Sequence, residues 1–293
     1  MTLGSSQSDS AKPRPMLKRA IPASAGKDML PVIGMGTWNT FDVGSSQSER
    51  APLQEVLNAF YEAGASVIDS SPMYGRAEGV TGDLVEAASA RDRTFLATKV
   101  WTSGADKGVA QIENSFHQLR AARLDLLQIH NLLDWRTHLP TLRSLKDSGR
   151  VRYIGVTHYT VNAHGDFESV LRAEPFDFVQ FNYSIATRAA EQRLLPLCQE
   201  RGIAVLINRP FEEGALFTKV GSRKLPGYAR EIDCTSWSQL FLKYIVSHPA
   251  VTCVIPATSR VSHMRDNGKG GSGRMPDEKL RQRMVKDFEQ GHS

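Results

Sequence analysis

Cysteine is scarce in this sequence, and long apolar runs are missing. The chain of 293 residues contains 3 cysteines, Cys198, Cys234 and Cys253, whose odd number and wide spacing argue against a disulfide framework. Free thiols in a reducing compartment are therefore expected. No apolar run reaches the roughly 18–20 residues that a membrane-spanning helix needs, so we expect no membrane span and no membrane partner.

Charge of one sign is not concentrated either. Lysine and arginine number 36 against 31 aspartates and glutamates, which gives a formal net charge of +5, and the two signs are interspersed. A nucleic-acid partner is therefore not expected, whereas a small molecule that carries phosphate suits a modest positive excess. No heptad pattern or long apolar stripe indicates an oligomer, so we expect a monomer.

The start of the chain lacks the apolar stretch of a secretory signal. Its first 15 residues, MTLGSSQSDSAKPRP, are polar. We expect residues 1–15 to form a disordered tail, residues 16–293 to form one domain, and the protein to be cytoplasmic.

Motifs of several common enzyme classes are absent. The sequence has no HxH, no HExxH and no cluster of histidine and cysteine, so no metal site is expected. It also has no GxSxG motif, which argues against a nucleophilic hydrolase.

What the sequence does contain is an alternation of eight short apolar segments with stretches of helical periodicity. Gly64, Gly149 and Gly202 each end a helical stretch just before an apolar segment begins, as a left-handed C-terminal glycine does. Segments that are apolar at nearly every position are typical of parallel strands buried on both faces. Eight such units in about 250 residues predict an α/β fold, the (β/α)8 TIM barrel. A doubly wound sheet is the alternative, but no GxGxxG follows the first segment. The expected strands span 31–37, 65–69, 95–100, 124–130, 151–156, 176–181, 203–207 and 251–255.

Three further segments fall outside this alternation. Residues 16–30 are expected to form a β-hairpin that covers the bottom of the barrel. The loop 208–232 is unusually long for a compact domain, which indicates a functional segment. The glycine-rich stretch 268–273 is expected to be a mobile connection, with a phosphate cradle as the alternative.

Ionisable residues end three successive expected strands. In a parallel barrel the active site lies at the C-terminal ends of the strands, where Asp69, Lys99 and His130 fall. Tyr74 follows Asp69 closely enough to reach the same opening. Each residue alone also suits a structural role: a cap, an ion pair, a core histidine or a packing residue. Together they predict proton transfer, in which Tyr74 is the acid, Lys99 lowers its pKa, Asp69 holds Lys99 and His130 orients a carbonyl or relays a proton.

A series of short motifs runs through the chain in a fixed order. They are GMGTW (34–38), Asp69-Ser-Ser-Pro-Met-Tyr-Gly75, TKVW (98–101), LLQIH (126–130), GRVRYIGVT (149–157), QFNY (180–183), VIP (254–256) and DN (266–267). Together they resemble the aldo-keto reductase superfamily over roughly residues 16–290. The resemblance implies hydride transfer from NADPH, or from NADH as the alternative, to an aldehyde or ketone. It also implies a catalytic tetrad of Asp69, Tyr74, Lys99 and His130, and a C-terminal helix that begins after Pro276.

The resemblance also assigns residues to the cofactor. Thr157, His158 and Gln180 would bind the nicotinamide amide, although many members have Ser-Asn where this chain has Thr-His. Further cofactor positions fall on Gly36, Thr37, Asp69 and Asn267.

Two positions depart from the family pattern. Asn208 stands where many members have an aromatic residue that stacks on the nicotinamide, so Arg209 is expected at the pyrophosphate and Phe211 in packing. Ala257 stands near the usual lysine for the 2′-phosphate of NADPH. The residues expected to replace that lysine are Ser259, Arg260 and His263.

The resemblance places the substrate pocket beside two tryptophans. Trp38 and Trp101 would line it together with parts of the loop 208–232, core packing being the alternative for both side chains. An aromatic-lined pocket suits aldehydes with apolar or aromatic bodies. Two other functions share these residues: a cofactor-binding regulatory or redox-sensing subunit with little turnover, and an NAD-dependent alcohol dehydrogenase.

Overall fold

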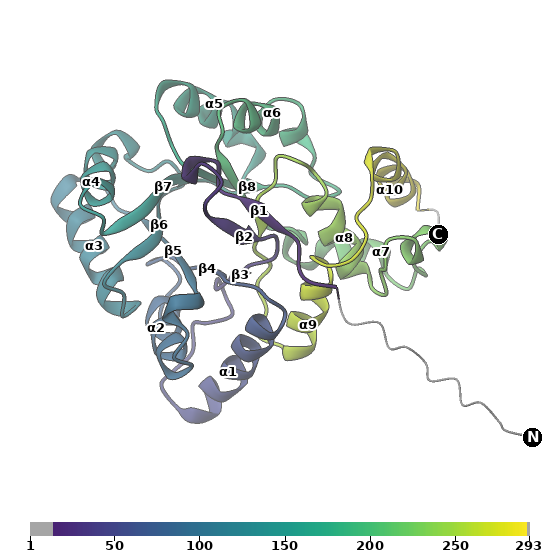
Figure 1. The fold of residues 1–293 in the computed structure, drawn as a ribbon, viewed down its shortest axis with the longest axis horizontal. Coiled ribbons are helices and arrows are strands. Elements are labelled where there is room, and N and C mark those ends of the chain that lie inside the picture. The colour runs from purple at the N-terminus through teal and green to yellow at the C-terminus, as the bar shows by residue number, and fades with distance from the viewer. Residues whose placement is uncertain (1–13, 292–293) are drawn as a thin grey trace, which may run out of the picture.

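The computed structural model describes residues 14–291, and its centre is a sheet of eight parallel strands surrounded by helices (Figure 1). The expected tail, residues 1–15, lies almost entirely outside the described residues. From β3 to β10 the strands are hydrogen-bonded in chain order. They are β3 (Met35–Gly36), β4 (Val67–Asp69), β5 (Phe95–Val100), β6 (Leu124–His130), β7 (Val151–Thr157), β8 (Phe178–Asn182), β9 (Ala204–Asn208) and β10 (Cys253–Val254).

The sheet closes on itself between its first and last strands. The amide of Val254 donates to Val32 O at 2.9 Å, and the amide of Gly34 donates to Val254 O at 2.8 Å. A parallel bridge also joins Gly36 to Ala257. The predicted (β/α)8 barrel is therefore confirmed. Its first and last strands are shorter than the sequence predicted, because the residues that flank them pair only through isolated bridges.

A β-hairpin precedes the barrel. Its strands β1 (Lys18–Ala20) and β2 (Met29–Pro31) pair antiparallel, and Figure 1 shows them lying across one end of the barrel. Ile21 and Leu30, at 0% and 3% exposure, join an apolar cluster with inward-facing strand residues such as Phe95. The hairpin thus closes the bottom of the barrel with apolar side chains, as predicted.

The helices pack around the outside of the strands, where a second and larger apolar cluster separates the two layers. Helix α10 is the C-terminal helix that the sequence predicted after Pro276; the side chain of Asp277 caps it by accepting from Leu280 N at 2.8 Å. The helices are α1 (Gln47–Glu62), α2 (Ala77–Ala87), α3 (Ala105–Gln118), α4 (Trp135–Asp147), α5 (His164–Ala173), α6 (Leu194–Glu200), α7 (Ala215–Val220), α8 (Trp237–Val246), α9 (Val261–Lys269) and α10 (Glu278–Gln290).

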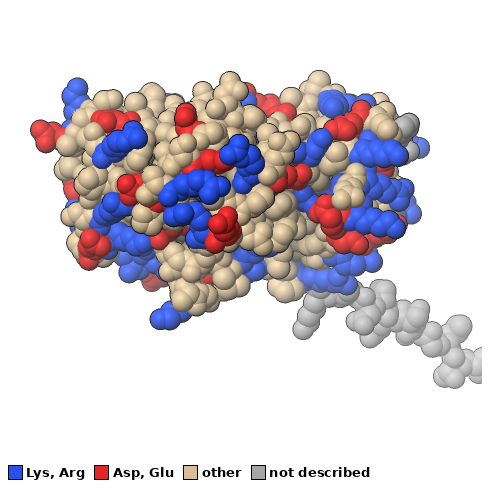
Figure 2. Space-filling model, turned by 90° about the horizontal axis from the view of Figure 1, so that it is seen from above, with Lys and Arg blue, Asp and Glu red and all other residues tan. Residues whose placement is uncertain are grey.

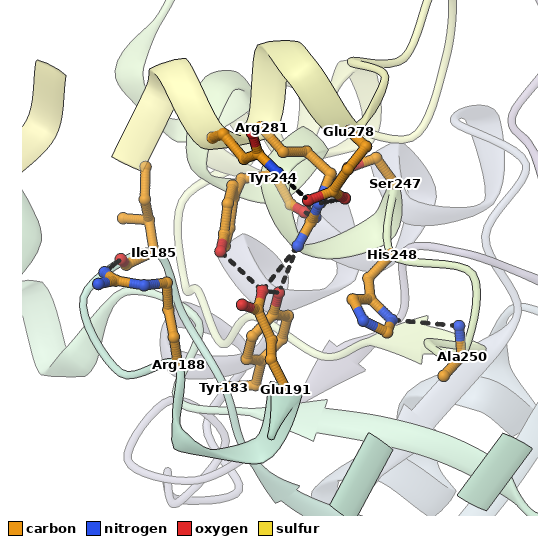
Figure 3. Close-up of polar contacts among 11 residues, drawn as sticks. Tyr183, Ile185, Arg188, Glu191, Tyr244, Ser247, His248, Ala250, Glu278 and Arg281 are labelled. Atoms are coloured by element: carbon orange, nitrogen blue, oxygen red, sulfur yellow. Dashed lines mark hydrogen bonds and ion pairs between the residues drawn. The ribbon is translucent and has the colours of Figure 1, made fainter. Parts of the chain in front are cut away.

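A buried ionic cluster fastens α10 to the barrel (Figure 3). The guanidinium of Arg281 donates to Glu191 Oε1 at 2.7 Å and to the hydroxyl of Tyr183 at 2.8 Å. Tyr244 on α8 donates to the same Glu191 oxygen at 2.8 Å. A buried arginine is tolerated because Glu191 neutralises its charge, so the cluster holds α10, α8 and the segment before α6 together.

Two expectations about irregular segments are corrected. The loop 208–232 is not wholly irregular, because it contains α7. The stretch 268–273 is not a mobile connection: its first part ends α9, and Gly268, Gly270 and Gly271 are buried. A Cβ on Gly270 would lie 2.8 Å from the Cβ of Leu242, and one on Gly271 would lie 2.7 Å from Ile33 Cγ1. Glycine is needed there for close packing.

The surface shows no segregation of charge in the face drawn in Figure 2, where basic and acidic side chains lie next to one another. Within residues 14–291, none of the helices combines the length and the apolarity required to cross a bilayer.

Candidate active site

Strand alternation places the predicted residues inside the barrel. Val67 on β4, Phe95 and Ala97 on β5, and Leu126 on β6 belong to the inner apolar cluster. Side chains of a strand point to opposite faces in turn, so the positions two or four residues further on face inward as well. Those positions are Asp69, Lys99, Gln128 and His130. The interior therefore changes from apolar at the hairpin end to polar at the carboxyl ends of the strands.

The structure brings the four predicted tetrad residues together. Lys99 Nζ lies 2.7 Å from Asp69 Oδ2 and also donates to Ser70 O at 2.6 Å. It lies 5.1 Å from the centroid of the Tyr74 ring. The rings of Tyr74 and His130 meet edge to face at 5.9 Å. Tyr74, Lys99 and His130 are thus within reach of one reacting group.

Burial sets the charge states of Lys99 and Tyr74. Burial opposes a charge on Lys99, but Asp69 and Tyr74 outweigh it and raise the pKa of Lys99, so the ammonium persists. Burial also raises the pKa of Tyr74, and Lys99 offsets this only in part. The expectation that Lys99 brings the pKa of Tyr74 below its ordinary value is therefore wrong for the protein alone, because desolvation of the phenolate is the larger effect.

His130 is neutral. Burial, the charge of Lys99 and the nearby His158 lower the pKa of His130 to about 2. Its Nδ1 lies 3.1 Å from the hydroxyl of Ser71, and its ring lies 6.4 Å from that of Trp101. A neutral imidazole offers one N–H donor, which suits contact with a carbonyl oxygen.

Sequence reasoning missed Gln128. Its amide Nε2 donates to Asp69 Oδ1 at 3.1 Å, so Asp69 is held by Gln128 on one oxygen and by Lys99 on the other. The signal was present: Gln128 is a polar residue in an otherwise apolar strand, two positions before His130 and hence on the same face.

A cavity of about 1190 Å³ opens above these residues. Its wall includes most of the positions assigned to catalysis, cofactor and substrate. These are Gly36, Thr37, Trp38, Asp69, Tyr74, Trp101, His130, Thr157, Gln180, Asn208, Arg209, Phe211, His263 and Asn267. Among the wall residues to which the sequence assigned no role are Met73, Tyr159 and Trp237.

Three of the assigned cofactor positions are not part of the wall, and neither is Lys99. Ser259 and Arg260 are exposed outside it. His158 turns toward its own loop: its Nδ1 accepts from the amide of Tyr159 at 2.9 Å, and the two rings stack 5.3 Å apart.

Three buried polar atoms of the wall lack a partner: Asn131 Oδ1 and two atoms on neighbouring strands. The hydroxyl of Thr157 donates to Gln180 Oε1 at 2.9 Å, which leaves Gln180 Nε2 as a free donor. Asn208 Nδ2 donates to His158 O at 3.0 Å, which leaves Asn208 Oδ1 as a free acceptor. Because buried polar groups are normally paired, these two atoms on the neighbouring strands β8 and β9 suit a ligand that both accepts and donates. A carboxamide such as that of nicotinamide does so, and the residues present therefore fit this group.

The wall of the cavity carries few positive charges. Asp266 accepts from Ser236 Oγ and from Gln239 Nε2, both at 2.6 Å. Arg209 is the one lysine or arginine on the described part of the wall, and it forms an ion pair with Glu213 at 3.1 Å. Its guanidinium also lies 5.6 Å from the ring centroid of Tyr159.

The cysteines do not form a reactive centre. All three are free and buried, and burial raises the pKa of Cys198 and of Cys234 to about 12. Within residues 14–291, no group of three or more His, Cys, Asp or Glu side chains is arranged to hold a metal ion.

Comparison with known proteins identifies the family. The model of the aldo/keto reductase family matches residues 32–282. Methylglyoxal reductase YeaE of Escherichia coli is 26% identical over 250 residues, 83% of this chain and 86% of that protein. The NADH-specific methylglyoxal reductase of the same organism is 27% identical over 243 residues, 72% and 73% of the two chains.

A solved structure gives the same result for the fold. The aldo-keto reductase from Klebsiella pneumoniae in complex with NADPH is 26% identical, with a TM-score of 0.74, and the match covers 92% of this chain and 96% of that one. A family match over most of the sequence and a shared barrel agree with the motif order, and this chain therefore belongs to the aldo/keto reductase family.

Proposed function

We propose that this protein reduces aldehydes and ketones to alcohols, with NADPH as the hydride donor and Tyr74 as the proton donor. The observation that carries the proposal is the convergence of Tyr74 and His130 in the wall of a cavity, with the ammonium of Lys99 5.1 Å from the ring centroid of Tyr74. The free atoms Gln180 Nε2 and Asn208 Oδ1 support a nicotinamide site in the same wall. NADPH, when bound, supplies the hydride; the other parts of the reaction fall to side chains of this chain.

Tyr74 has the properties of a general acid at neutral pH. Its raised pKa keeps the hydroxyl protonated until a carbonyl oxygen gains negative charge and takes the proton. Lys99, 5.1 Å from the ring centroid, then stabilises the phenolate that remains. Asp69 keeps Lys99 charged and aimed, and Gln128 fixes Asp69 in turn.

The mouth of the cavity favours substrates with apolar or aromatic bodies. Trp38, Met73, Trp101 and Phe217 line it and are 43%, 38%, 39% and 37% exposed. Large apolar side chains left open to solvent around a cavity indicate a ligand that covers them. Two relatives are named methylglyoxal reductases, so methylglyoxal is a second substrate to compare with an aromatic aldehyde.

The preference for NADPH over NADH is expected to be small. Structures at 26% and 25% identity contain NADPH and NADP, which supports NADPH. However, Ala257 is uncharged and Arg260 does not line the cavity. Among the residues predicted to bind the 2′-phosphate, His263 is therefore the one basic side chain in the cavity wall. We expect dissociation constants within about tenfold of each other, a difference of about 1.4 kcal/mol. Fluorescence titration with each dinucleotide measures this ratio, and a hundredfold preference for either one contradicts it.

The test of the main proposal is oxidation of NADPH, followed by its absorbance, with an aromatic aldehyde and with methylglyoxal. Wild-type protein is compared with Tyr74→Phe, which keeps the ring against His130 and removes only the hydroxyl. We expect turnover by the wild type and a loss of about 10²–10⁴-fold in the variant, with NADPH binding retained. Full turnover by Tyr74→Phe would refute Tyr74 as the proton donor. NADPH binding without turnover of any carbonyl favours a regulatory role instead.

A further inference from the structure

Ser71 is a buried side chain to which the proposed reaction assigns no role. It lies just after β4, two residues beyond Asp69 and three before Tyr74, and it is 0% exposed. Its hydroxyl oxygen lies 3.1 Å from Nδ1 of His130. A hydrogen-bond partner at one ring nitrogen of a histidine can decide which of the two nitrogens carries the proton.

The hydrogen bonds around Ser71 indicate their direction. The amide of Met73 donates to Ser71 Oγ at 3.4 Å, so this oxygen already accepts one hydrogen. The hydroxyl hydrogen of Ser71 needs an acceptor, because an unpaired donor is costly in a buried position. His130 Nδ1 is the acceptor that the described structure offers. Ser71 therefore donates to Nδ1, and the single hydrogen of the neutral imidazole lies on Nε2.

The position of that hydrogen matters at the cavity. His130 belongs to the cavity wall, and its Nδ1 is engaged by Ser71, so Nε2 is the nitrogen that remains for a ligand. With its hydrogen on Nε2, His130 donates to a carbonyl oxygen beside Tyr74. With the hydrogen on Nδ1, the lone pair of Nε2 would face the lone pairs of that oxygen and repel them.

We propose that Ser71 is a positioning residue, which fixes His130 as the Nε2-protonated tautomer and so aims its N–H at the substrate carbonyl. The inference rests on the proposed reduction, because it assigns His130 a carbonyl oxygen as its partner. Ser71 itself touches neither substrate nor cofactor in this role and acts only through the ring of His130.

The kinetic test uses Ser71→Ala in two backgrounds. In the otherwise wild-type protein we expect kcat/KM to fall about tenfold, mainly through kcat, because the lost contact serves the transition state. In a His130→Ala background the same change is expected to cost nothing, because the residue through which Ser71 acts is gone. An equal loss in both backgrounds would overturn the proposal.

Ser115→Ala is the matched control. Ser115 is equally buried, its hydroxyl donates to Glu78 Oε2 at 3.2 Å, and neither residue lines the cavity. It reports the effect of deleting a buried, hydrogen-bonded serine hydroxyl, and its kcat/KM is expected to equal that of the wild type. A loss in Ser115→Ala as large as that in Ser71→Ala would assign the effect to general packing and overturn the proposal.

The second readout needs no turnover. Nitrogen-15 NMR of the histidine-labelled protein is expected to show His130 with the hydrogen on Nε2 alone, and Ser71→Ala is expected to introduce a fraction with the hydrogen on Nδ1. A wild-type His130 protonated on Nδ1, or a Ser71→Ala spectrum with unchanged tautomers, would overturn the role of Ser71. Because this measurement is independent of substrate, failure of the proposed reduction and failure of the Ser71 inference are distinguishable.

Discussion

Tyr74 and Tyr153 lie toward opposite ends of the barrel, and each has a charged partner of a different kind. Near the carboxyl ends of the strands, the ammonium of Lys99 lies 5.1 Å from the ring centroid of Tyr74. Near the hairpin, Tyr153 donates its hydroxyl hydrogen to Asp28, which also forms an ion pair with Arg152 at 2.6 Å. One phenol thus lies beside a cation and the other beside a carboxylate.

This difference in charged partner distinguishes a tyrosine proposed for catalysis from a tyrosine that stabilises the fold. Burial raises the pKa of both phenols, and the hydrogen bond to Asp28 contributes to a pKa of about 12 for Tyr153. At Tyr74 the charge of Lys99 acts in the opposite sense and supports loss of the proton. A carboxylate therefore holds a proton on Tyr153 in a fixed structural contact, whereas an ammonium favours loss of the proton from Tyr74, as the proposed reduction requires. This agrees with the general division of parallel barrels into a catalytic and a stabilising face.

Removing each phenol hydroxyl tests the comparison most directly. Tyr74→Phe is expected to lower kcat/KM by about 10²–10⁴-fold with little change in stability. Tyr153→Phe loses one hydrogen bond, so we expect about 0.5–1.5 kcal/mol less stability and unchanged turnover. Steady-state kinetics and urea unfolding of both variants measure this, and similar kinetic losses in the two would abolish the distinction.

Removing the two cations is expected to have a smaller but still clear effect. Lys99→Met leaves the buried carboxylate of Asp69 without the one cation paired with it among the described residues, and we expect a cost of about 3–5 kcal/mol. Arg152→Met is expected to cost about 1 kcal/mol or less, since Arg152 is partly exposed and Arg91 still pairs with Asp125.

Urea unfolding of the two cation variants gives their free energies of unfolding. Turnover by Arg152→Met serves as the control, because this residue is not part of the cavity wall. Equal destabilisation of the two variants would mean that breaking the buried ion pair of Lys99 and Asp69 costs no more than breaking the partly exposed pairs of Arg152.

The pH dependence sharpens the comparison with the smallest expected effect. Because the pKa of His130 is lowered to about 2, this residue stays neutral and gives no acid limb near pH 6. In the proposed reaction Tyr74 acts in its protonated form. Because the pKa of Tyr74 is raised, kcat/KM is expected to be flat from about pH 6 to 9 and to fall only above the ordinary tyrosine value of about 10. A bell-shaped profile centred near pH 7 would contradict both assignments.

The stability conferred by Tyr153 has its own pH window. Its pKa is about 12 in the folded protein and about 10 when unfolded. A raised folded value means that the contribution is fully present below about pH 10 and is lost as the pH rises through about 12. This loss of stability is measured by urea unfolding at pH 9 and at higher pH, with Tyr153→Phe as the reference. Turnover at neutral pH is expected to be unaffected.

Much of the fold and the tetrad was predictable because strands impose a simple rule. Apolar runs with glycine-ended helices between them fix the order of β and α segments, and the last residues of three runs, Asp69, Lys99 and His130, share one opening in any parallel barrel. Other features were not predictable. Gly270 and Gly271 pack against Leu242 and Ile33, which are remote in sequence. The glycine-rich composition of 268–273 indicated mobility, which was wrong because these distant contacts cannot be read from the segment itself.

The same limit applies to the site. Sequence alone placed His158 and Arg260 at the cofactor, whereas hydrogen bonds within its own loop turn His158 away and Arg260 lies outside the cavity wall. It also predicted a lowered pKa for Tyr74, because the effect of Lys99 follows from residue types but the opposing burial does not.

The sequence by itself therefore determined the strand order, the family and the residues that face the barrel opening, since these depend on periodicity and on residue type along one segment. The tertiary structure alone decided which charges are buried, which polar atoms remain unpaired and how Ser71 meets His130. Those properties arise from atoms that belong to different strands and loops, and their distances are set only when the barrel closes.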